Sequence, residues 1–574
     1  MSLRFLISAC PLQRAALGLT IAITPLCTQA ASPLRGNPVD SVPRIESPPD
    51  QTPTPAPAVQ APTPQQQAMQ ARLAQQIIPR NFDVTGVRSI DFNSVTAILT
   101  PLANRTVTLG ELIVEVDKIT ALYRAQGYPL SFALLQNQNF ENGLVVVTVI
   151  EGHVGDVQID GDIGRASSRL KSLAEPLLAE KPLTQATLER TLNLMRTVPG
   201  VTITPALDLP RRSDGASTLA IKAERQAFTA TGGLADLGTG LQPLATVAAN
   251  SLTPLGEQLR LTSSVPLASD DVRYIQGEVT VPIGNQGTAI KLDGYHYRAE
   301  PSDEAVQALG FDRRVRNNRI GLGVSHPFLL NNRQSLTGTF GVYAVDSSDL
   351  YTQRGGDRTL EQDTRVRAAT VEMRYFQVSD TRSSEIKLGV SRGVDGLGAR
   401  KTIESNYGYS AVPDVDLNFT RANLDLRQTF TLPAQFGVVL AGTGQYSDNT
   451  LPSSEQISFG SWRYGMGYPQ GEKSGDKGFG LSAELNRRFA TGWSYVSSVQ
   501  PYALVDYAKS WYNSAALSTL RNRNLSSAAL GVRFTDDKYY LLDFNVAKPT
   551  GAVPTNGDRD LRFNANYTLF YGAR

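Results

Sequence analysis

Near the end of the chain, the segment 561–569 reads LRFNANYTL and alternates strictly between apolar and polar side chains. Its apolar positions are Leu561, Phe563, Ala565, Tyr567 and Leu569, and its polar positions are Arg562, Asn564, Asn566 and Thr568. A period of two is typical of a β-strand with one apolar and one polar face. Similar runs recur around 258–265, 336–344 and 542–546, with turn residues between them. The part of the chain from 226 to 574 is therefore predicted to be antiparallel β-structure.

Two architectures share this alternation, a soluble β-sandwich and a transmembrane β-barrel. A barrel requires a period of two because its strands face lipid outside and water inside. Closure also leaves no strand edge unpaired in the hydrocarbon. The size of the region, about 350 residues, exceeds an ordinary sandwich domain. These points favour the barrel.

The N-terminus points the same way, because residues 1–30 have the features of a secretory signal peptide. Arg4 and Arg14 supply positive charge, Ala15–Leu26 is apolar, and Thr28-Gln29-Ala30 offers a cleavage site. Both cysteines, Cys10 and Cys27, lie within it, so cleavage would remove all thiol chemistry. Lipidation of Cys27 is the alternative, in a poor sequence context. After this segment, no apolar run reaches the 18 residues that a transmembrane helix requires.

Between the signal and the barrel, composition changes three times. Residues 31–64 are rich in proline and small polar residues, which predicts an extended linker. Residues 65–80 have helix-favouring composition and are expected to form a short helix. Two consecutive units, 81–152 and 153–225, then repeat the order strand, helix, helix, strand, strand. Two small α+β domains are expected there.

A long loop, FGSWRYGMGYPQGEKSGDKG at 459–478, interrupts the β-rich region. Loops of this length inside a compact fold are usually functional or disordered. Trp462, Tyr464 and Tyr468 argue against disorder, since aromatic residues are depleted in disordered segments. This loop is the leading candidate for a functional site.

The loop resembles the pore loop of two-partner secretion transporters (TpsB proteins, the haemolysin secretion/activation family), which belong to the superfamily of the barrel-assembly insertase. The motif residues carried over are Arg463, Tyr464, Gly465, Met466, Gly467, Tyr468, Glu472, Ser474, Gly475, Asp476 and Gly478. Met466 stands where the family has its most characteristic arginine. The segment 547–563 is similar to the last hairpin of the family. Pieces of both α+β units, AQGYPLS, VIEG and LERTLNLMRTVPGV, are similar to the family's polypeptide-transport-associated (POTRA) domain.

This resemblance implies a specific architecture and function. The fold would be a transmembrane antiparallel barrel of about sixteen strands, preceded by two periplasmic POTRA domains. The protein would sit in a Gram-negative outer membrane, among outer-membrane lipid and lipopolysaccharide. It would translocate an unfolded exoprotein that carries a two-partner secretion domain. The alternatives are an outer-membrane insertion factor and a passive porin or receptor, and the paired POTRA-like units and the loop motif favour the transporter.

The resemblance also implies contacts for the loop. Asp506, in PYALVDYAKSW at 501–511, would be the wall residue that pairs with the loop. Two interpretations follow from Met466. Either Arg463 takes over the contact with Asp506, or the ionic contact is absent and the loop is held by packing of Trp462, Tyr464, Met466 and Tyr468. Residues 65–78 would be either a solvated lead-in helix or a pore plug.

A client would add a strand to the first POTRA-like unit. The residues where this is expected are Gly127, Tyr128, Leu130, Phe132 and Leu134.

No residue constellation indicates catalysis or a cofactor. The three histidines lie in separate segments without metal-ligand spacing, and neither a nucleophile elbow nor a P-loop motif is found. The formal net charge of +2 gives no basis for a nucleic-acid surface. The expectation is a protein that is not an enzyme and that uses no metal, nucleotide or nucleic acid.

Overall fold

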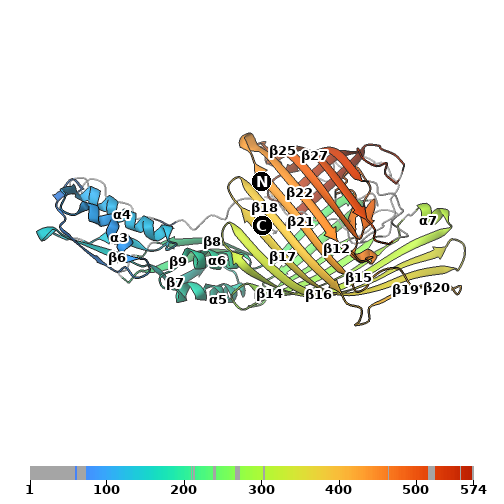
Figure 1. The fold of residues 1–574 in the computed structure, drawn as a ribbon, viewed down its shortest axis with the longest axis horizontal. Coiled ribbons are helices and arrows are strands. Elements are labelled where there is room, and N and C mark those ends of the chain that lie inside the picture. Colours follow the sequence, from blue (N-terminus) through green and yellow to red (C-terminus); the bar gives the residue numbers. More distant parts are fainter. Residues whose placement is uncertain are drawn as a thin grey trace, which may run out of the picture.

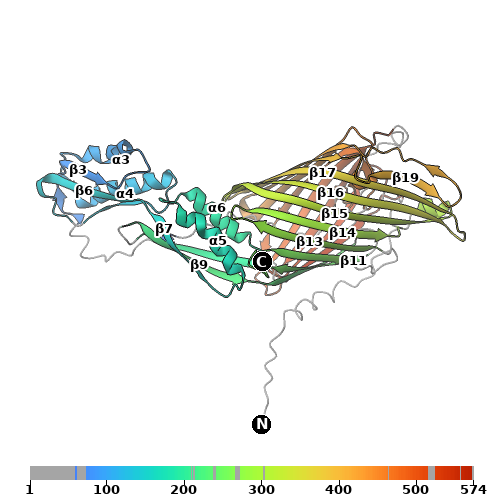
Figure 2. The same cartoon turned by 90° about the horizontal axis from the view of Figure 1, so that it is seen from below.

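A computed structural model describes residues 59–60, 73–136, 138–208, 210, 214–236, 241–264, 272–301, 304–462, 464–514, 524–555 and 557–571. Two small α+β units extend in a line from one end of a large β-barrel (Figure 1). The same arrangement is seen from below in Figure 2. The predicted signal peptide and most of the predicted linker lie outside the described residues. No helix in the described part of the chain is both long and apolar enough to cross a membrane.

Sixteen antiparallel strands form the closed barrel wall, as predicted. They are β10 (Phe228–Asp236), β11 (Leu241–Asn250), β12 (Gln258–Ser264), β13 (Arg273–Ile283), β14 (Thr288–Ala299), β15 (Phe311–Leu330), β16 (Gln334–Gln353), β17 (Thr359–Val378), β18 (Arg382–Gly393), β21 (Thr420–Thr431), β22 (Phe436–Tyr446), β25 (Lys477–Arg487), β27 (Ser498–Trp511), β28 (Leu525–Thr535), β29 (Tyr540–Pro549) and β30 (Arg562–Tyr571). The last strand pairs with the first, with Leu569 opposite Gly232, and this pairing closes the barrel.

Short elements decorate the wall. The β19 (Arg400–Ser405) and β20 (Ser410–Ala411) hairpin pairs with the outer end of β17, and β26 (Phe489–Ala490) continues β25 against β27. A short helix, α7 (Glu304–Ala308), precedes β15, and a 3-10 turn, η4 (Pro433–Gln435), joins β21 to β22.

The alternation predicted for these strands is observed. On β12, Leu261 is 53% exposed while Thr262, the next residue, is 9% exposed. On β30, Phe563 is 61% exposed and Thr568 is 1% exposed. Apolar side chains therefore cover the outside of the barrel and polar ones line its inside, as a lipid-embedded barrel requires.

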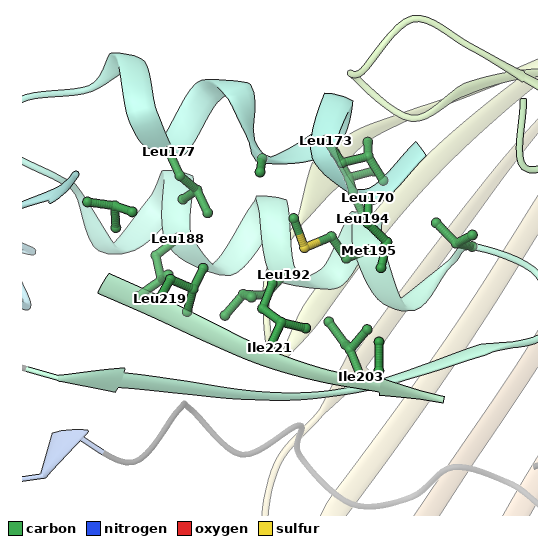
Figure 3. Packing of buried hydrophobic residues seen from close by; sticks show 14 of the residues in the cluster. Leu170, Leu173, Leu177, Leu188, Leu192, Leu194, Met195, Ile203, Leu219 and Ile221 are labelled. Carbon is green, nitrogen blue, oxygen red and sulfur yellow. The ribbon is translucent and has the colours of Figure 1, made fainter. Parts of the chain in front are cut away.

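The unit next to the barrel has two helices packed on a sheet. Its elements are β7 (His153–Asp160), α5 (Ala166–Ala179), α6 (Gln185–Arg196), β8 (Val201–Asp208) and β9 (Ala216–Arg225). The helices present leucines to the sheet at helical spacing, and Leu170, Leu177 and Leu192 are essentially inaccessible (Figure 3). At the sheet edge, β1 (Val59–Gln60) from the predicted linker pairs in parallel with β8.

The outer unit has the expected order of strand, helix, helix, strand and strand, and its two helices are α3 and α4. Its elements are β2 (Gln76–Ile77), β3 (Asn81–Thr85), α3 (Phe92–Leu99), η2 (Thr100–Leu102), β4 (Val107–Thr108), α4 (Leu109–Ala125), β5 (Phe132–Leu135), η3 (Glu141–Gly143) and β6 (Leu144–Ile150). Helix α4 starts at a capping box, in which the Thr108 and Glu111 side chains accept each other's backbone N–H groups.

The prediction of a helix over 65–80 is wrong for its last part. Gln76 and Ile77 form strand β2, which pairs with β4, and Ile77 is buried in the core of the outer unit. Local composition favoured a helix, but burial of Ile77 beside Val107 decides the conformation. Residues 65–72, which carry most of the plug alternative, lie outside the described residues.

The inner unit is fastened to the turns at the near end of the barrel. The Arg190 guanidinium donates to the carbonyl oxygens of Gln286 and Pro327, at 3.0 Å each. Asn193, one turn further along α6, donates to the Asn332 side chain at 2.8 Å. Gln286 and Asn332 lie in turns between strands and Pro327 lies near the end of β15, so the helices of the inner unit are positioned at this end of the barrel.

Candidate functional site: a loop docked inside the barrel

The segment between β22 and β25 turns into the barrel lumen. It contains η5 (Ser453–Glu455) and a small hairpin of β23 (Ile457–Phe459) and β24 (Lys473–Gly475). The wall it meets is the inner face of β27 to β30: on β27, Val505 is 57% exposed and points outward, whereas Asp506 is 7% exposed and points inward. The predicted loop 459–478 thus ends in β25 and lies largely inside the barrel.

An apolar cluster holds the loop against this wall. Phe459 and Tyr468 from the loop are both 0% exposed, and they pack with Ala508 on β27 and Leu525 on β28. Tyr464 joins them, with its ring edge-on to Phe459 at 6.4 Å between centroids. Of the aromatic residues expected to pack, Tyr464 and Tyr468 therefore do so.

Asp506 is the point where the loop tip meets the wall. Its Oδ2 accepts the backbone N–H of Met466 at 2.8 Å. Its Oδ1 accepts the backbone N–H and the hydroxyl of Ser527, at 3.0 and 2.6 Å. The carboxylate thus links the loop to both β27 and β28 without requiring an arginine from the loop at Met466.

The Arg463 interpretation concerns a residue that lies outside the described residues. Packing by Tyr464 and Tyr468 is observed, together with a main-chain contact that neither interpretation included. The contact that is observed comes from main chain at the very position where the family arginine is replaced. The Met466 carbonyl also accepts from the Asn564 side chain, at 3.3 Å, which ties the loop tip to β30. The sequence does not reveal the contact between the Met466 N–H and Asp506, because every residue except proline carries the same backbone donor.

Two carboxylates on the returning limb of the loop are also held by main-chain donors. Asp476 is 0% exposed and accepts the backbone N–H groups of Leu451 and Asn513, at 2.8 and 2.7 Å. Glu472 accepts the backbone N–H and the hydroxyl of Thr555, at 2.9 and 2.7 Å. Both motif residues therefore fix the loop to other segments of the C-terminal barrel.

The remaining polar motif residues make similar links. The Ser474 hydroxyl lies 2.6 Å from the hydroxyl of Tyr512. The backbone carbonyl of Ser474 accepts a hydrogen bond from the Ser510 hydroxyl at 2.9 Å. The Tyr468 hydroxyl donates to the Ala552 carbonyl at 2.9 Å.

Glycine is required at two points where the loop touches the wall backbone. A Cβ at Gly475 would lie 2.5 Å from the carbonyl oxygen of Trp511, and one at Gly467 would lie 2.6 Å from the nitrogen of Pro549. Both distances are below any real Cβ contact, and both neighbours are backbone atoms that cannot swing away. The glycines of the motif therefore permit close docking. Gly465 has a φ of +114°, and a Cβ at Gly478, the second residue of β25, would lie 2.7 Å from the carbonyl oxygen of Lys509.

A second anchor, on the entering limb, was not predicted. The Glu455 carboxylate pairs with the Arg421 guanidinium of β21 at 2.7 Å and accepts the Tyr343 hydroxyl of β16 at 2.9 Å. The Glu455 side chain is only 3% exposed. The Gln445 amide donates to the Glu455 carbonyl at 2.9 Å. No sequence signal identifies this anchor, because its partners come from three different strands.

The tentative client-binding residues fall into two groups. Phe132 and Leu134 lie on β5, an edge strand of the outer sheet, which among the described residues pairs with β6 on one side. One backbone amide of this strand, that of Ala133, is already bonded to the Thr120 hydroxyl of α4 at 3.0 Å. The strand edge beside α4 is therefore partly occupied by a side chain.

The other three residues lie at the junction of the two units. Leu130 is 0% exposed and belongs to the core of the inner unit. The Gly127 carbonyl accepts the backbone N–H of Gln185 at the start of α6, at 2.7 Å. Tyr128 packs edge-on against Tyr123. Leu130 is thus inaccessible to a client, contrary to the expectation, because it serves as a structural link between the units.

Comparison with known proteins identifies a family and a domain in this chain. Residues 217–534 match the family model described as haemolysin secretion/activation protein ShlB/FhaC/HecB, and residues 77–152 match the POTRA domain, ShlB-type. The heme/hemopexin transporter protein HuxB of Haemophilus influenzae (strain 86-028NP) is 23% identical over 515 residues, which cover 83% of this chain and 85% of HuxB. The outer membrane transporter CdiB of Dickeya dadantii is 22% identical, covering 68% of this chain and 69% of CdiB.

Solved structures show the same fold. CdiB from Escherichia coli aligns with a TM-score of 0.66 at 18% identity, covering 90% of this chain and 94% of CdiB. BamA from Haemophilus ducreyi lacking POTRA domains 1–3 aligns with a TM-score of 0.53 at 14% identity, covering 87% of this chain and all of that chain.

A closed barrel with an inward-docked loop and POTRA structure at one end defines a class, the outer-membrane transporters with periplasmic POTRA domains. Within that class, the chain belongs to the haemolysin secretion/activation protein family ShlB/FhaC/HecB. It is an outer-membrane transporter of the two-partner secretion type, as the sequence predicted. This is a family of transporters rather than of enzymes.

Proposed function

We propose that this transporter recognises one large unfolded exoprotein with a two-partner secretion domain at its periplasmic units and passes it through the barrel lumen. The observation that carries the proposal is the loop docked inside a closed barrel by polar contacts to the wall. The wall residues that hold the loop are Asp506, Arg421 and Tyr343. Release of these contacts would open the lumen without unfolding the wall.

Domain assignments follow from this proposal. Residues 1–30 act as signal peptide, 31–64 as linker, 81–152 and 153–225 as POTRA domains, and 226–574 as the barrel. The motif residues of the loop, together with Asp506, act as the gate. Phe132 and Leu134 on the edge strand receive an extended client segment, whose main chain pairs with β5. Such pairing would displace the Thr120 hydroxyl from the Ala133 amide.

Transport would proceed without catalysis. Neither a nucleotide nor a proton gradient acts directly at the outer membrane, so folding of the client outside the cell is the driving force. A client that has folded outside can no longer return through the lumen. The outer wall would meanwhile contact membrane lipid and lipopolysaccharide.

The experiment compares the proteins that paired cells release into the medium, with and without this gene. We expect the loss of one large secreted protein while other outer-membrane barrels remain inserted, and that protein is the client. A general loss of barrels would instead indicate an insertion factor. No change in either would leave a porin or receptor. HuxB is described as a heme/hemopexin transporter protein and CdiB as an outer membrane transporter, so these relatives do not identify a common client. The client must therefore be identified directly.

A further inference from the structure

The lipid-facing wall of β25 shows where the membrane begins and ends. Its outward-facing residues are Lys477, four apolar residues (Phe479, Leu481, Ala483 and Leu485) and Arg487. The two basic residues are ten residue steps apart. At a rise of about 3.3 Å per residue and a tilt of about 40°, this separation spans about 25 Å along the membrane normal. That distance is the height of the apolar band of an outer-membrane barrel.

The two ends of this strand face different leaflets. The turn at Asn332 contacts the inner α+β unit and therefore marks the periplasmic end of the barrel. Strand direction alternates from one antiparallel strand to the next. On β25, Arg487 therefore lies at the periplasmic end and Lys477 at the outer end. The outer leaflet of this membrane is the one that carries lipopolysaccharide, whose lipid anchor bears phosphate groups.

A compact cluster of cations and aromatic rings occupies the outer end on three neighbouring strands. The Lys477 ammonium lies over the Tyr446 ring, 5.8 Å from its centroid, and the Lys509 ammonium lies over Trp511 at 5.0 Å. Phe479 packs between Tyr507 and Trp511, with centroid distances of 5.9 and 6.0 Å. These six residues are called the outer Lys-aromatic cluster.

The two lysines are placed to act on one ligand. Lys477 pairs in register with Trp511 and Phe479 with Lys509, so the lysines are diagonal neighbours on the same outward face. Diagonal Cα atoms lie about 7–8 Å apart, close enough for both ammonium groups to reach one phosphate. A carboxylate at this end, Asp448, accepts the Tyr446 hydroxyl at 2.6 Å. In the part of the chain that the structure describes, neither lysine forms an ion pair.

We propose that the outer Lys-aromatic cluster binds the phosphate-bearing headgroup of the outer-leaflet glycolipid. This inference rests on the proposed lipopolysaccharide contact and gives it a site. The rings sit at the interface, where amphipathic aromatic side chains are favoured. The two ammonium groups supply the charge for phosphate, and the apolar residues below them contact the acyl chains.

A loop anchor lies directly before strand β25. Asp476 points inward and holds Leu451 and Asn513, while Lys477, the next residue, points outward. A bound headgroup would therefore brace the wall one residue from the point where the loop returns to it.

The test measures binding of bisphosphoryl lipid A to the purified full-length transporter by native mass spectrometry. We expect the variant K477Q/K509Q to bind at least about tenfold more weakly than the unmodified protein, because each basic residue near the surface adds to anionic-lipid affinity. The matched control is R487Q: Arg487 also lies over two rings, Phe436 and Phe489, but at the periplasmic interface. It should bind as the unmodified protein does.

Two further probes separate the sources of phosphate. The unmodified protein should bind dephosphorylated lipid A about as weakly as the double variant binds bisphosphoryl lipid A. It should not bind inorganic phosphate measurably. Unchanged affinity in K477Q/K509Q, an equal loss in R487Q, or equal binding of the dephosphorylated lipid would each overturn the proposal. Client release is measured separately in the same strains. A failure of secretion would count against the proposed function, whereas the lipid-binding assay tests the headgroup site independently.

Discussion

Replacing Glu455 with glutamine should release the entering limb of the loop. The Glu455 side chain is 3% exposed and its partner Arg421 is 19% exposed, so the pair is held away from solvent. Removing one member of a buried ion pair costs about 3–5 kcal/mol. Glutamine keeps one acceptor oxygen, so we take the lower value. About 3 kcal/mol corresponds to an increase of roughly 100-fold in the ratio of undocked to docked loop.

The assay is the conductance of the purified protein in planar lipid bilayers, scored as the ratio of open to closed time. That ratio should rise by about two orders of magnitude in E455Q if the open level reports the undocked loop. Arg421→Met should act in the same direction, and the double variant should add little, because both changes remove one interaction.

The matched control is Glu300→Gln. Glu300 also contacts two arginines, Arg298 at 2.8 Å and Arg314 at 2.7 Å, but its side chain is 39% exposed. Such exposed pairs contribute about 0–1 kcal/mol, and this one does not touch the loop. An open-to-closed ratio in E455Q equal to that of the unmodified protein, with the barrel shown to be folded by its heat-modifiable mobility, would refute the reasoning.

Three other changes test the remaining contacts. Asp506→Ala should raise the open-to-closed ratio in planar bilayers, since it leaves the backbone N–H of Met466 without its wall acceptor, whereas Met466→Ala keeps that N–H and should leave the ratio nearly unchanged; equal effects would contradict a main-chain anchor. Gly475→Ala should expose the loop to added protease in intact membranes, because its Cβ would lie 2.5 Å from a wall carbonyl, and a protected loop would count against close docking. In the outer POTRA domain, burial alone would raise the pKa of Glu151, but hydrogen bonds from the backbone N–H groups of Arg88 and Ser89 and from two hydroxyls outweigh it and lower that pKa. The stability that this lowered pKa provides is present above the ordinary glutamate pKa of about 4.3 and is lost as the pH falls through the lowered value. Hydrogen exchange of the full-length protein measures the stability of the POTRA region against pH. In Glu151→Gln, this stability should no longer depend on pH in that acidic range.

Much of the barrel could be predicted from the sequence because its cause is local. Lipid on one side and water on the other impose a period of two on each strand separately, so the run at 561–569 carries the signal within nine residues. The loop was found for a similar reason, since its glycines and aromatic residues lie within one segment. The family resemblance then supplied Asp506 as the wall partner, and the structure places it within hydrogen-bonding distance of the loop tip.

Local composition misled where a distant contact decides the outcome. Gln76 and Ile77 follow a helix-favouring run, yet they form a strand because Ile77 enters the core beside Val107. Leu130 looked like an accessible residue next to an edge strand, but it is buried in the core of the neighbouring unit.

The sequence by itself determined the barrel, the paired α+β units and the position of the loop, because each depends on spacing along a single segment. Only the tertiary structure decided what holds the loop. Closure of the barrel brings Tyr343 and Arg421, from two separate strands, to Glu455 of the loop, and it turns the backbone of Met466 toward Asp506. Contacts of this kind depend on how the wall curves around the lumen, and a main-chain donor has no sequence signature to reveal it.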